Sequence, residues 1–171
     1  MHNYLKAAYL FGIIGGLFCG LAFLLTYIMG KDPISFTEIF GYLLIPVFVF
    51  MAIKNFRQNI NNGELGFGQG MTIGFFVYSI LALISALVIF IVLQFDTAIF
   101  EEFKTANLAL LEEKKEVLIA QLDEVSYERT LKNISNMTIL DVVLNDFLRK
   151  VFPGLFFTII ISIILKRSKN Q

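Results

Sequence analysis

The sequence contains no tryptophan, one cysteine and one histidine among its 171 residues. The single cysteine, Cys19, excludes an internal disulfide bond and any metal site built from several thiolates. The single histidine, His2, leaves histidine-based metal sites and Ser-His or Cys-His nucleophile pairs without support. The sequence therefore predicts no catalytic, metal-binding or cofactor-binding residue, and we expect a protein that is not an enzyme and needs no cofactor.

Charge is also scarce, at 16% of the residues, whereas 57% are hydrophobic. Soluble domains average about 25% charged and about 45–50% apolar residues. Of the 28 acidic and basic residues, 18 lie between Asp96 and Lys150, and long stretches elsewhere carry none. A bilayer imposes such a distribution, because a charge at its centre costs several kcal/mol. We therefore expect the lipid bilayer as a partner, and no nucleic acid.

Four apolar segments approach or exceed the roughly 20 residues with which a helix crosses a bilayer. The predicted spans cover residues 7–29, 37–54, 70–95 and 147–165. Turns separate the first three spans, because glycine, proline and charge interrupt helices there. Pro46 predicts a kink in the second span. The predicted fold class is all-α: an integral membrane protein with four transmembrane helices in a single membrane domain, residues 1–171, and a helical extramembrane segment between helices 3 and 4.

The hydrophilic insertion, residues 96–146, lies between the third and fourth spans. Its leucines recur at heptad-like spacing, and its opposite charges stand three or four residues apart, as on solvated helix faces. We expect one amphipathic helix over about 98–125 and a shorter one near 126–134. The heptad run is too short for a stable coiled coil, so the insertion either folds as a helical hairpin or lies on the membrane surface.

Four spans place both ends of the chain on one side of the membrane. The basic residues near that side are Lys6, Lys54, Arg57, Lys166, Arg167 and Lys169. Because basic residues near span ends favour the cytoplasm, we expect both termini to be cytoplasmic and the insertion to lie outside. Arg149 and Lys150 stand at the other end, at the start of the fourth span, where their charges are expected to reach the headgroups.

Small residues recur at every fourth position in two of the spans. They are Gly12, Gly16 and Gly20 in the first span, and Gly66, Gly70 and Gly74 in the third. Residues four apart share one helix face, and small side chains on that face allow two backbones to approach closely. We therefore interpret these glycines as helix-packing residues. They predict that the first and third spans pack tightly, within one chain or across a homo-oligomer.

The turn before the third span reads NNGELGFGQGMTIG, residues 61–74. It differs from phosphate-cradling loops, because it lacks a preceding strand and a Lys-Ser/Thr ending. The turn resembles the motif of an uncharacterised bacterial membrane family catalogued as domain of unknown function 4199. The residues that carry this resemblance are Asn62, Gly63, Phe67, Gly68, Gln69, Gly70 and Gly74. The resemblance implies four spans, a hydrophilic insertion before the last span, a basic tail and a bacterial inner (cytoplasmic) membrane, but no reaction.

Two functions stay open at this point. The first is a non-enzymatic scaffold or accessory subunit, whose residues 96–146 contact a membrane protein partner. The second is a pathway for a small solute or ion, formed by an oligomer. Ion-coupled transport generally needs an ionisable group within the membrane, and the predicted spans hold charges only near their ends. The sequence therefore favours the scaffold.

Overall fold

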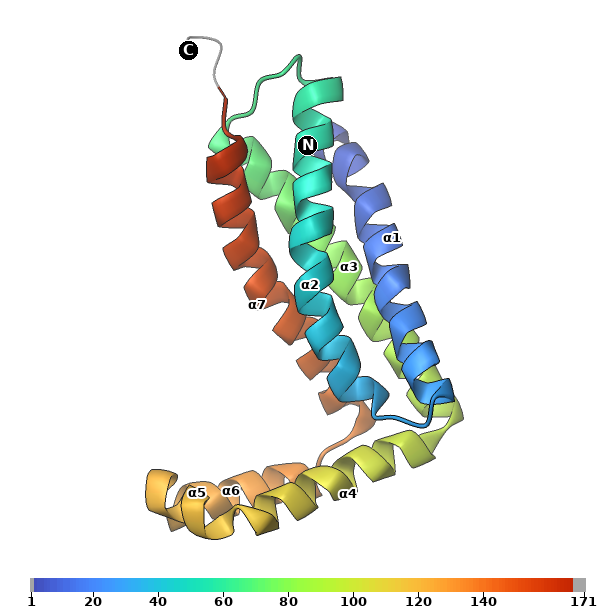
Figure 1. Ribbon diagram of the computed structural model, residues 1–171, viewed down its shortest axis with the longest axis vertical. Coiled ribbons are helices and arrows are strands. Elements are labelled where there is room, and N and C mark those ends of the chain that lie inside the picture. Colours follow the sequence, from blue (N-terminus) through green and yellow to red (C-terminus); the bar gives the residue numbers. More distant parts are fainter. Residues whose placement is uncertain (1, 168–171) are drawn as a thin grey trace.

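The structure is a computed structural model that describes residues 2–167. Four long helices stand side by side as a bundle (Figure 1): α1 (His2–Ile28), α2 (Pro33–Asn55), α3 (Phe67–Phe95) and α7 (Ile139–Leu165). Each is long and apolar enough to cross a membrane, and the described part of the chain contains no strand. The predicted all-α fold with four membrane helices is confirmed. Lys169 lies outside the described residues.

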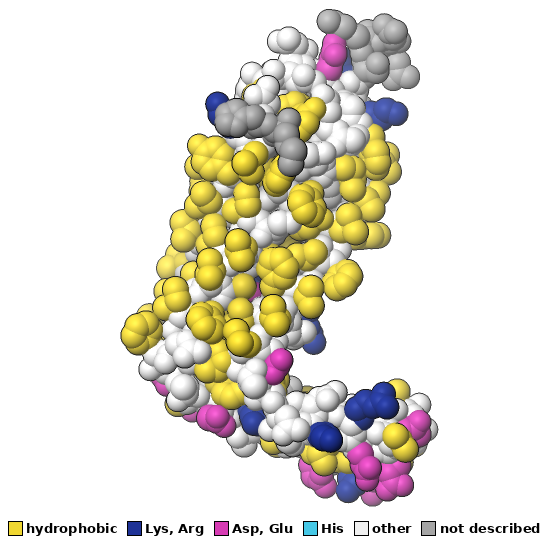
Figure 2. Space-filling model, turned by 180° about the vertical axis from the view of Figure 1, so that it is seen from behind, with side chains coloured by type: hydrophobic (Ala, Val, Ile, Leu, Met, Phe, Trp, Pro, Cys, Tyr) yellow, Lys and Arg dark blue, Asp and Glu magenta, His cyan; other side chains and the backbone are white. Residues whose placement is uncertain are grey.

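Helix α3 packs against α1, α2 and α7, and its contacts with α1 and α7 are the most extensive in the bundle. It contributes Ile73, Val77 and Leu81 to a buried core, to which α2 adds Ile45 and Val49. Large apolar side chains also cover the outside of the bundle (Figure 2). Helices that are apolar on all sides are typical of membrane spans, because lipid surrounds them. The outer apolar side chains therefore form a belt that faces lipid.

Helix α2 begins earlier than the predicted span, at Pro33 instead of residue 37. The side chain of Asp32 caps it by accepting hydrogen bonds from the backbone N–H groups of Ile34 and Ser35, at 2.9 and 3.2 Å. Proline suits the first helical position, because the N–H group that it lacks would find no partner there. At its other end the helix continues into a π-helical turn, η1 (Phe56–Ile60).

Helix α7 begins at Ile139, eight residues before the predicted fourth span. Thr138 and Asp141 form a reciprocal cap at its start. The backbone N–H of Asp141 donates to Thr138 Oγ1 at 3.3 Å, and the backbone N–H of Thr138 donates to Asp141 Oδ2 at 2.8 Å. This cap starts the helix within the segment predicted as hydrophilic insertion. Asp146 consequently belongs to the bundle and not to the insertion.

Three shorter helices form an arm across the end of the bundle that lies away from the start of α1 and the end of α7 (Figure 1): α4 (Thr97–Glu113), α5 (Lys115–Leu122) and α6 (Glu124–Ser135). The predicted helix over 98–125 is interrupted at Lys114 and again at Asp123, where φ is +101°. The chain turns back there, so that α6 packs against α4 and α5. The Tyr127 hydroxyl donates to Glu112 Oε2 across the hairpin, at 2.9 Å. The structure thus contains the predicted helical hairpin.

The glycines of α1 lie against branched side chains of α3. A Cβ atom added to Gly12, Gly16 or Gly20 would lie 2.8, 2.7 or 2.9 Å from atoms of Ile80, Ile84 and Val88, respectively. Real Cβ atoms do not approach neighbours so closely, so these positions admit only glycine unless the helices separate. The glycines therefore allow α1 and α3 to pack in close contact, as small residues do between membrane helices.

The glycines of α3 lie against α7 and not against α1. A Cβ atom on Gly70 would lie 2.6 Å from Ser162 Oγ, and one on Gly74 would lie 2.6 Å from Thr158 Oγ1. Gly66 precedes α3 as its N-cap, and its nearest neighbour outside the adjoining residues is Gln69, at 3.5 Å. The packing role predicted for Gly66 is wrong, because the helix begins only after it.

We expect Gly16→Leu to destabilise the bundle, because even the first carbon of the new side chain would overlap Ile84. Overpacking of this kind costs about 1–3 kcal/mol. The measurement is the unfolding temperature of the purified protein in detergent, which should fall in the variant. Gly68→Leu is the matched control, since no atom lies within 4 Å of a Cβ at that position. Equal unfolding temperatures for the two variants would contradict the close contact.

Candidate functional site

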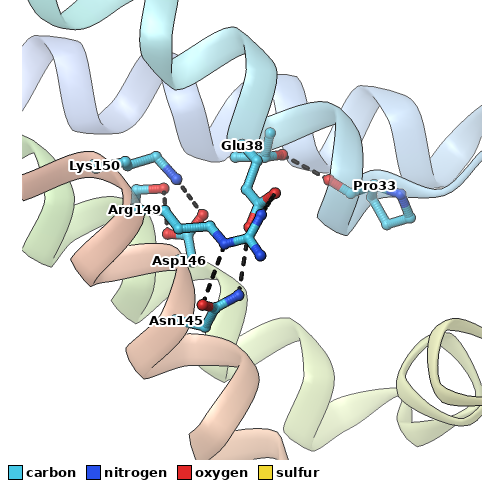
Figure 3. Close-up of polar contacts among 8 residues, drawn as sticks. Pro33, Glu38, Asn145, Asp146, Arg149 and Lys150 are labelled. Carbon is cyan, nitrogen blue, oxygen red and sulfur yellow. Dashed lines mark hydrogen bonds and ion pairs between the residues drawn. The ribbon is translucent and has the colours of Figure 1, made fainter. Parts of the chain in front are cut away.

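A lysine and an aspartate form an ion pair inside the bundle (Figure 3). Asp146 and Lys150 stand one turn apart on α7, and their side chains are only 3% and 0% exposed. Lys150 Nζ donates to Asp146 Oδ1. The hydroxyl of Ser85, on α3, donates to Asp146 Oδ2 at 3.4 Å. Both charges are thus compensated within the helix that carries them, and a neighbouring helix adds a polar contact.

The neighbouring helix α2 makes room for the lysine. A Cβ atom at Gly41 would lie 2.7 Å from Lys150 Cε, so the absence of a side chain there accommodates the lysine stem. The buried Thr37 hydroxyl donates to the carbonyl oxygen of Pro33, at 2.8 Å, and so satisfies its own hydrogen-bonding need. The buried ion pair, Asp146 and Lys150, therefore lies in a site that three helices enclose.

The buried ion pair corrects the sequence prediction for Lys150. The sequence predicts that this residue extends toward the headgroups, but it turns inward to Asp146. The prediction is wrong because Asp146 belongs to α7 and not to the insertion, so the lysine has a partner within its own helix. Two features of the sequence indicate the correct arrangement. Thr138 and Asp141 have the spacing of a helix start, and Asp146 and Lys150 have the i,i+4 spacing of a helical ion pair.

A second ion pair joins α7 to α2 closer to the surface (Figure 3). Arg149 Nη1 donates to Glu38 Oε2 at 2.8 Å, and Arg149 Nε donates to Asn145 Oδ1 at 3.2 Å. The arginine side chain is half exposed. Glu38 thus holds Arg149 at the edge of the bundle.

A pocket of about 580 Å³ lies where the arm meets the bundle. We call it the junction pocket. Helices α2, α4, α6 and α7 and the α6–α7 turn contribute its lining, which combines charged residues, amides and apolar side chains. Its charged lining residues are Glu38, Lys132, Asp141, Asp146 and Arg149. One carboxylate of the buried ion pair therefore borders a space that a ligand could enter.

The residues of the 61–74 motif lie at the opposite end of the bundle and shape its turn. Asn62 and Gly63 have positive φ angles, of 51° and 86°, which the tight turn requires. Gln69 Oε1 accepts a hydrogen bond from the backbone N–H of Gly66 at 2.8 Å. Phe67 is exposed and Gly68 has open space beside it, while Gly70 and Gly74 pack against side chains of α7. These residues determine the fold of the turn and lie far from the ion pairs.

The same turn is attached to the chain that follows α7. The backbone N–H groups of Leu65 and Arg167 each donate to the other residue's carbonyl oxygen, at 2.9 and 3.0 Å. Arg57 Nη1 also donates to the carbonyl oxygen of Leu165, at 3.2 Å.

Residues 2–167 contain no group of three or more His, Cys, Asp or Glu side chains that could hold a metal ion.

Four apolar helices of membrane-crossing length, packed around a buried core, define a multi-pass α-helical membrane protein. A family model described as "Protein of unknown function (DUF4199)" matches residues 10–167. The chain therefore belongs to the DUF4199 family, as the motif at residues 61–74 predicted. No curated protein and no solved structure matches the chain.

We expect that removal of one partner of the buried ion pair destabilises the protein far more than removal of both. Asp146→Leu leaves the Lys150 charge buried alone, which costs about 3–5 kcal/mol. The double variant Asp146→Leu/Lys150→Met leaves no charge and should recover most of this loss. Denaturant unfolding of the purified protein in detergent measures both effects.

The partly exposed Glu38–Arg149 pair provides the control for this cycle. Glu38→Gln should cost about 1 kcal/mol or less, because water can solvate the arginine that remains. If Asp146→Leu were as stable as Glu38→Gln, the aspartate would not be stabilising a buried charge.

Proposed function

We propose that the protein is a non-enzymatic scaffold or accessory subunit of a bacterial inner membrane, and that its arm contacts a membrane protein partner. The surface of the arm is the observation that carries this proposal. Its exposed large apolar side chains include Leu110, Val117, Leu122 and Val125, the last of them 67% exposed. Burial against a partner would remove these side chains from water, which is favourable.

The connection between arm and bundle supports the same role. At the base of the arm, Ile99 and Phe100 of α4 pack against Leu93 of α3 and Val142 of α7. The tip of the arm, at α5, extends sideways beyond the bundle (Figure 1). A base that is packed into the core and a tip without bundle contacts suit an element that is presented to another molecule.

The proposed orientation places both termini in the cytoplasm and the arm outside. The support is the charge distribution, since the described basic residues Lys6, Lys54, Arg57, Lys166 and Arg167 lie near the end of the bundle that is remote from the arm. Basic residues that flank spans favour the cytoplasmic side. On this basis the partner meets the arm at the outer face of the membrane.

Site-directed crosslinking tests the partner and the orientation together. Val125→Cys places a thiol on the arm, and Gln58→Cys places one at the other end, while the native Cys19 is buried. A membrane-impermeant, thiol-reactive photo-crosslinker is added to spheroplasts. We expect Val125→Cys to give an adduct of defined mass with a membrane protein, or with a second copy of this chain, and Gln58→Cys to remain unlabelled.

Two further variants distinguish specific contact from collision. Leu122→Glu, combined with Val125→Cys, should reduce the adduct at least severalfold, because it places a charge in the apolar contact. Gln121→Glu adds the same charge at the neighbouring exposed residue and should leave the adduct unchanged. Equal yields in these two backgrounds would refute the contact, and labelling of Gln58→Cys from outside would reverse the orientation.

The buried ion pair favours a second function, a pathway for an ion or small solute formed by an oligomer. Ionisable residues within membrane spans are costly and commonly belong to ion or proton pathways. Asp146 supports this reading because it borders both Lys150 and the junction pocket. The pair also explains helix packing, however, and this ranks the pathway below the scaffold.

Flux through reconstituted vesicles tests this second function. Vesicles that contain the protein and a trapped pH-sensitive dye should dissipate an imposed proton gradient faster than protein-free vesicles. The double variant Asp146→Leu/Lys150→Met should abolish the difference, because it removes both ionisable groups. Rates equal to those of empty vesicles for protons, sodium, potassium and chloride would rule out an ion pathway.

A further inference from the structure

The junction pocket lies at the level where the apolar belt of the bundle ends. On α7, Leu140 and Leu144 are exposed beside the pocket residues Asp141 and Asn145. Figure 2 shows the apolar belt reaching down to the region where the arm leaves the bundle. In a membrane this is the depth of the headgroups, where phosphate groups, glycerol and the first carbons of the acyl chains lie side by side.

The cationic side chains of the pocket have hydrogen-bonding capacity to spare. Lys132, on α6, makes no ion pair with any described residue. Arg149 uses Nε and Nη1 for Asn145 and Glu38, and its Nη2 makes no hydrogen bond within residues 2–167. A guanidinium and an ammonium that face one space are the groups with which proteins bind phosphate.

Two of the three carboxylates of the pocket, by contrast, pair with cations. Glu38 pairs with Arg149, and Asp146 pairs with Lys150. Asp141 accepts hydrogen bonds from the backbone N–H and the hydroxyl of Thr138, at 2.8 and 2.6 Å. Within residues 2–167, Asp141 therefore keeps a charge that no cation neutralises, and Lys132 is the lining cation that pairs with no carboxylate. The phosphate group of a ligand can pair with Lys132.

The remainder of the lining distinguishes between anions. Phe103, Ile134 and Met137 are half-buried and give the pocket an apolar wall. A free inorganic anion gains nothing from such a wall, whereas a phospholipid can place its glycerol and upper acyl carbons there. We propose that the junction pocket binds a phospholipid from the leaflet on the arm side, with Lys132 and Arg149 as ligands of its phosphate group and the apolar wall against its glycerol region.

Native mass spectrometry of the full chain in detergent, after removal of endogenous lipid, tests the proposal. Phosphatidylglycerol is added, and a diacylglycerol with the same acyl chains serves as a probe that lacks the phosphate. We expect saturable binding of one phosphatidylglycerol molecule per chain, and much weaker binding of diacylglycerol. Equal binding of the two lipids would overturn the assignment of the phosphate to the cationic side chains.

Substitutions of lysine identify the ligand residue. Lys132→Gln should weaken phosphatidylglycerol binding about tenfold, which corresponds to about 1.4 kcal/mol. Lys132→Arg should preserve it. Lys114→Gln is the matched control, because it removes the same charge from the arm at an exposed position that does not line the pocket. Equal affinities for Lys132→Gln and Lys114→Gln would overturn the role of Lys132.

Inorganic phosphate is the third probe in the test. Millimolar phosphate should leave phosphatidylglycerol bound, because the apolar wall contributes to the affinity for the lipid alone. Complete displacement would show that the pocket binds a soluble phosphate instead of a lipid. Lys132 is exposed, so its variants should unfold at the wild-type temperature. If a Lys132 variant unfolded at a lower temperature, the comparison of phosphatidylglycerol, diacylglycerol and inorganic phosphate on the unmodified chain would still decide the proposal.

Discussion

An aspartate and a lysine that point into the interior of a membrane helix bundle need partners there, because an isolated charge in the apolar interior costs several kcal/mol. In this protein Asp146 and Lys150 satisfy that constraint one turn apart on α7. The surrounding structure adapts to the pair: α2 presents Gly41 to the lysine stem, and α3 presents the Ser85 hydroxyl to the carboxylate. The relative positions of three helices thus depend on one ion pair.

Close backbone contacts complete the arrangement on both sides of α3. On one side, the glycines of α1 receive Ile80, Ile84 and Val88. On the other side, α3 supplies the glycines, and α7 supplies Thr158 and Ser162. Lipid cannot drive helices together through the hydrophobic effect, so dense van der Waals contact must do so. Helix α3 consequently has close contacts with two of its neighbours, α1 and α7, through two different faces.

Runs without charge predicted the four helices, because the cost of burying charge leaves a clear pattern in the sequence. The start of α7 escaped prediction because Asp141 and Asp146 appear hydrophilic until the first is recognised as a cap and the second as half of a pair. The interruption at Asp123 escaped too, since a positive φ at an aspartate depends on its surroundings. There the backbone N–H of Ser126 donates to the carboxylate at 2.6 Å and lowers the pKa of Asp123. The junction pocket combines four helices and has no counterpart in any single segment.

The attachments at the two ends of α7 together determine its axial position. Near the arm, Arg149 holds the helix to Glu38 of α2, and at the other end Arg167 holds it to Leu65. A shift of α7 by one turn, about 5.4 Å, would break both attachments at once. Sliding of α7 between the two membrane surfaces is therefore opposed at both ends of the helix. The arm joins the bundle at the α6–α7 turn and at the base of α4.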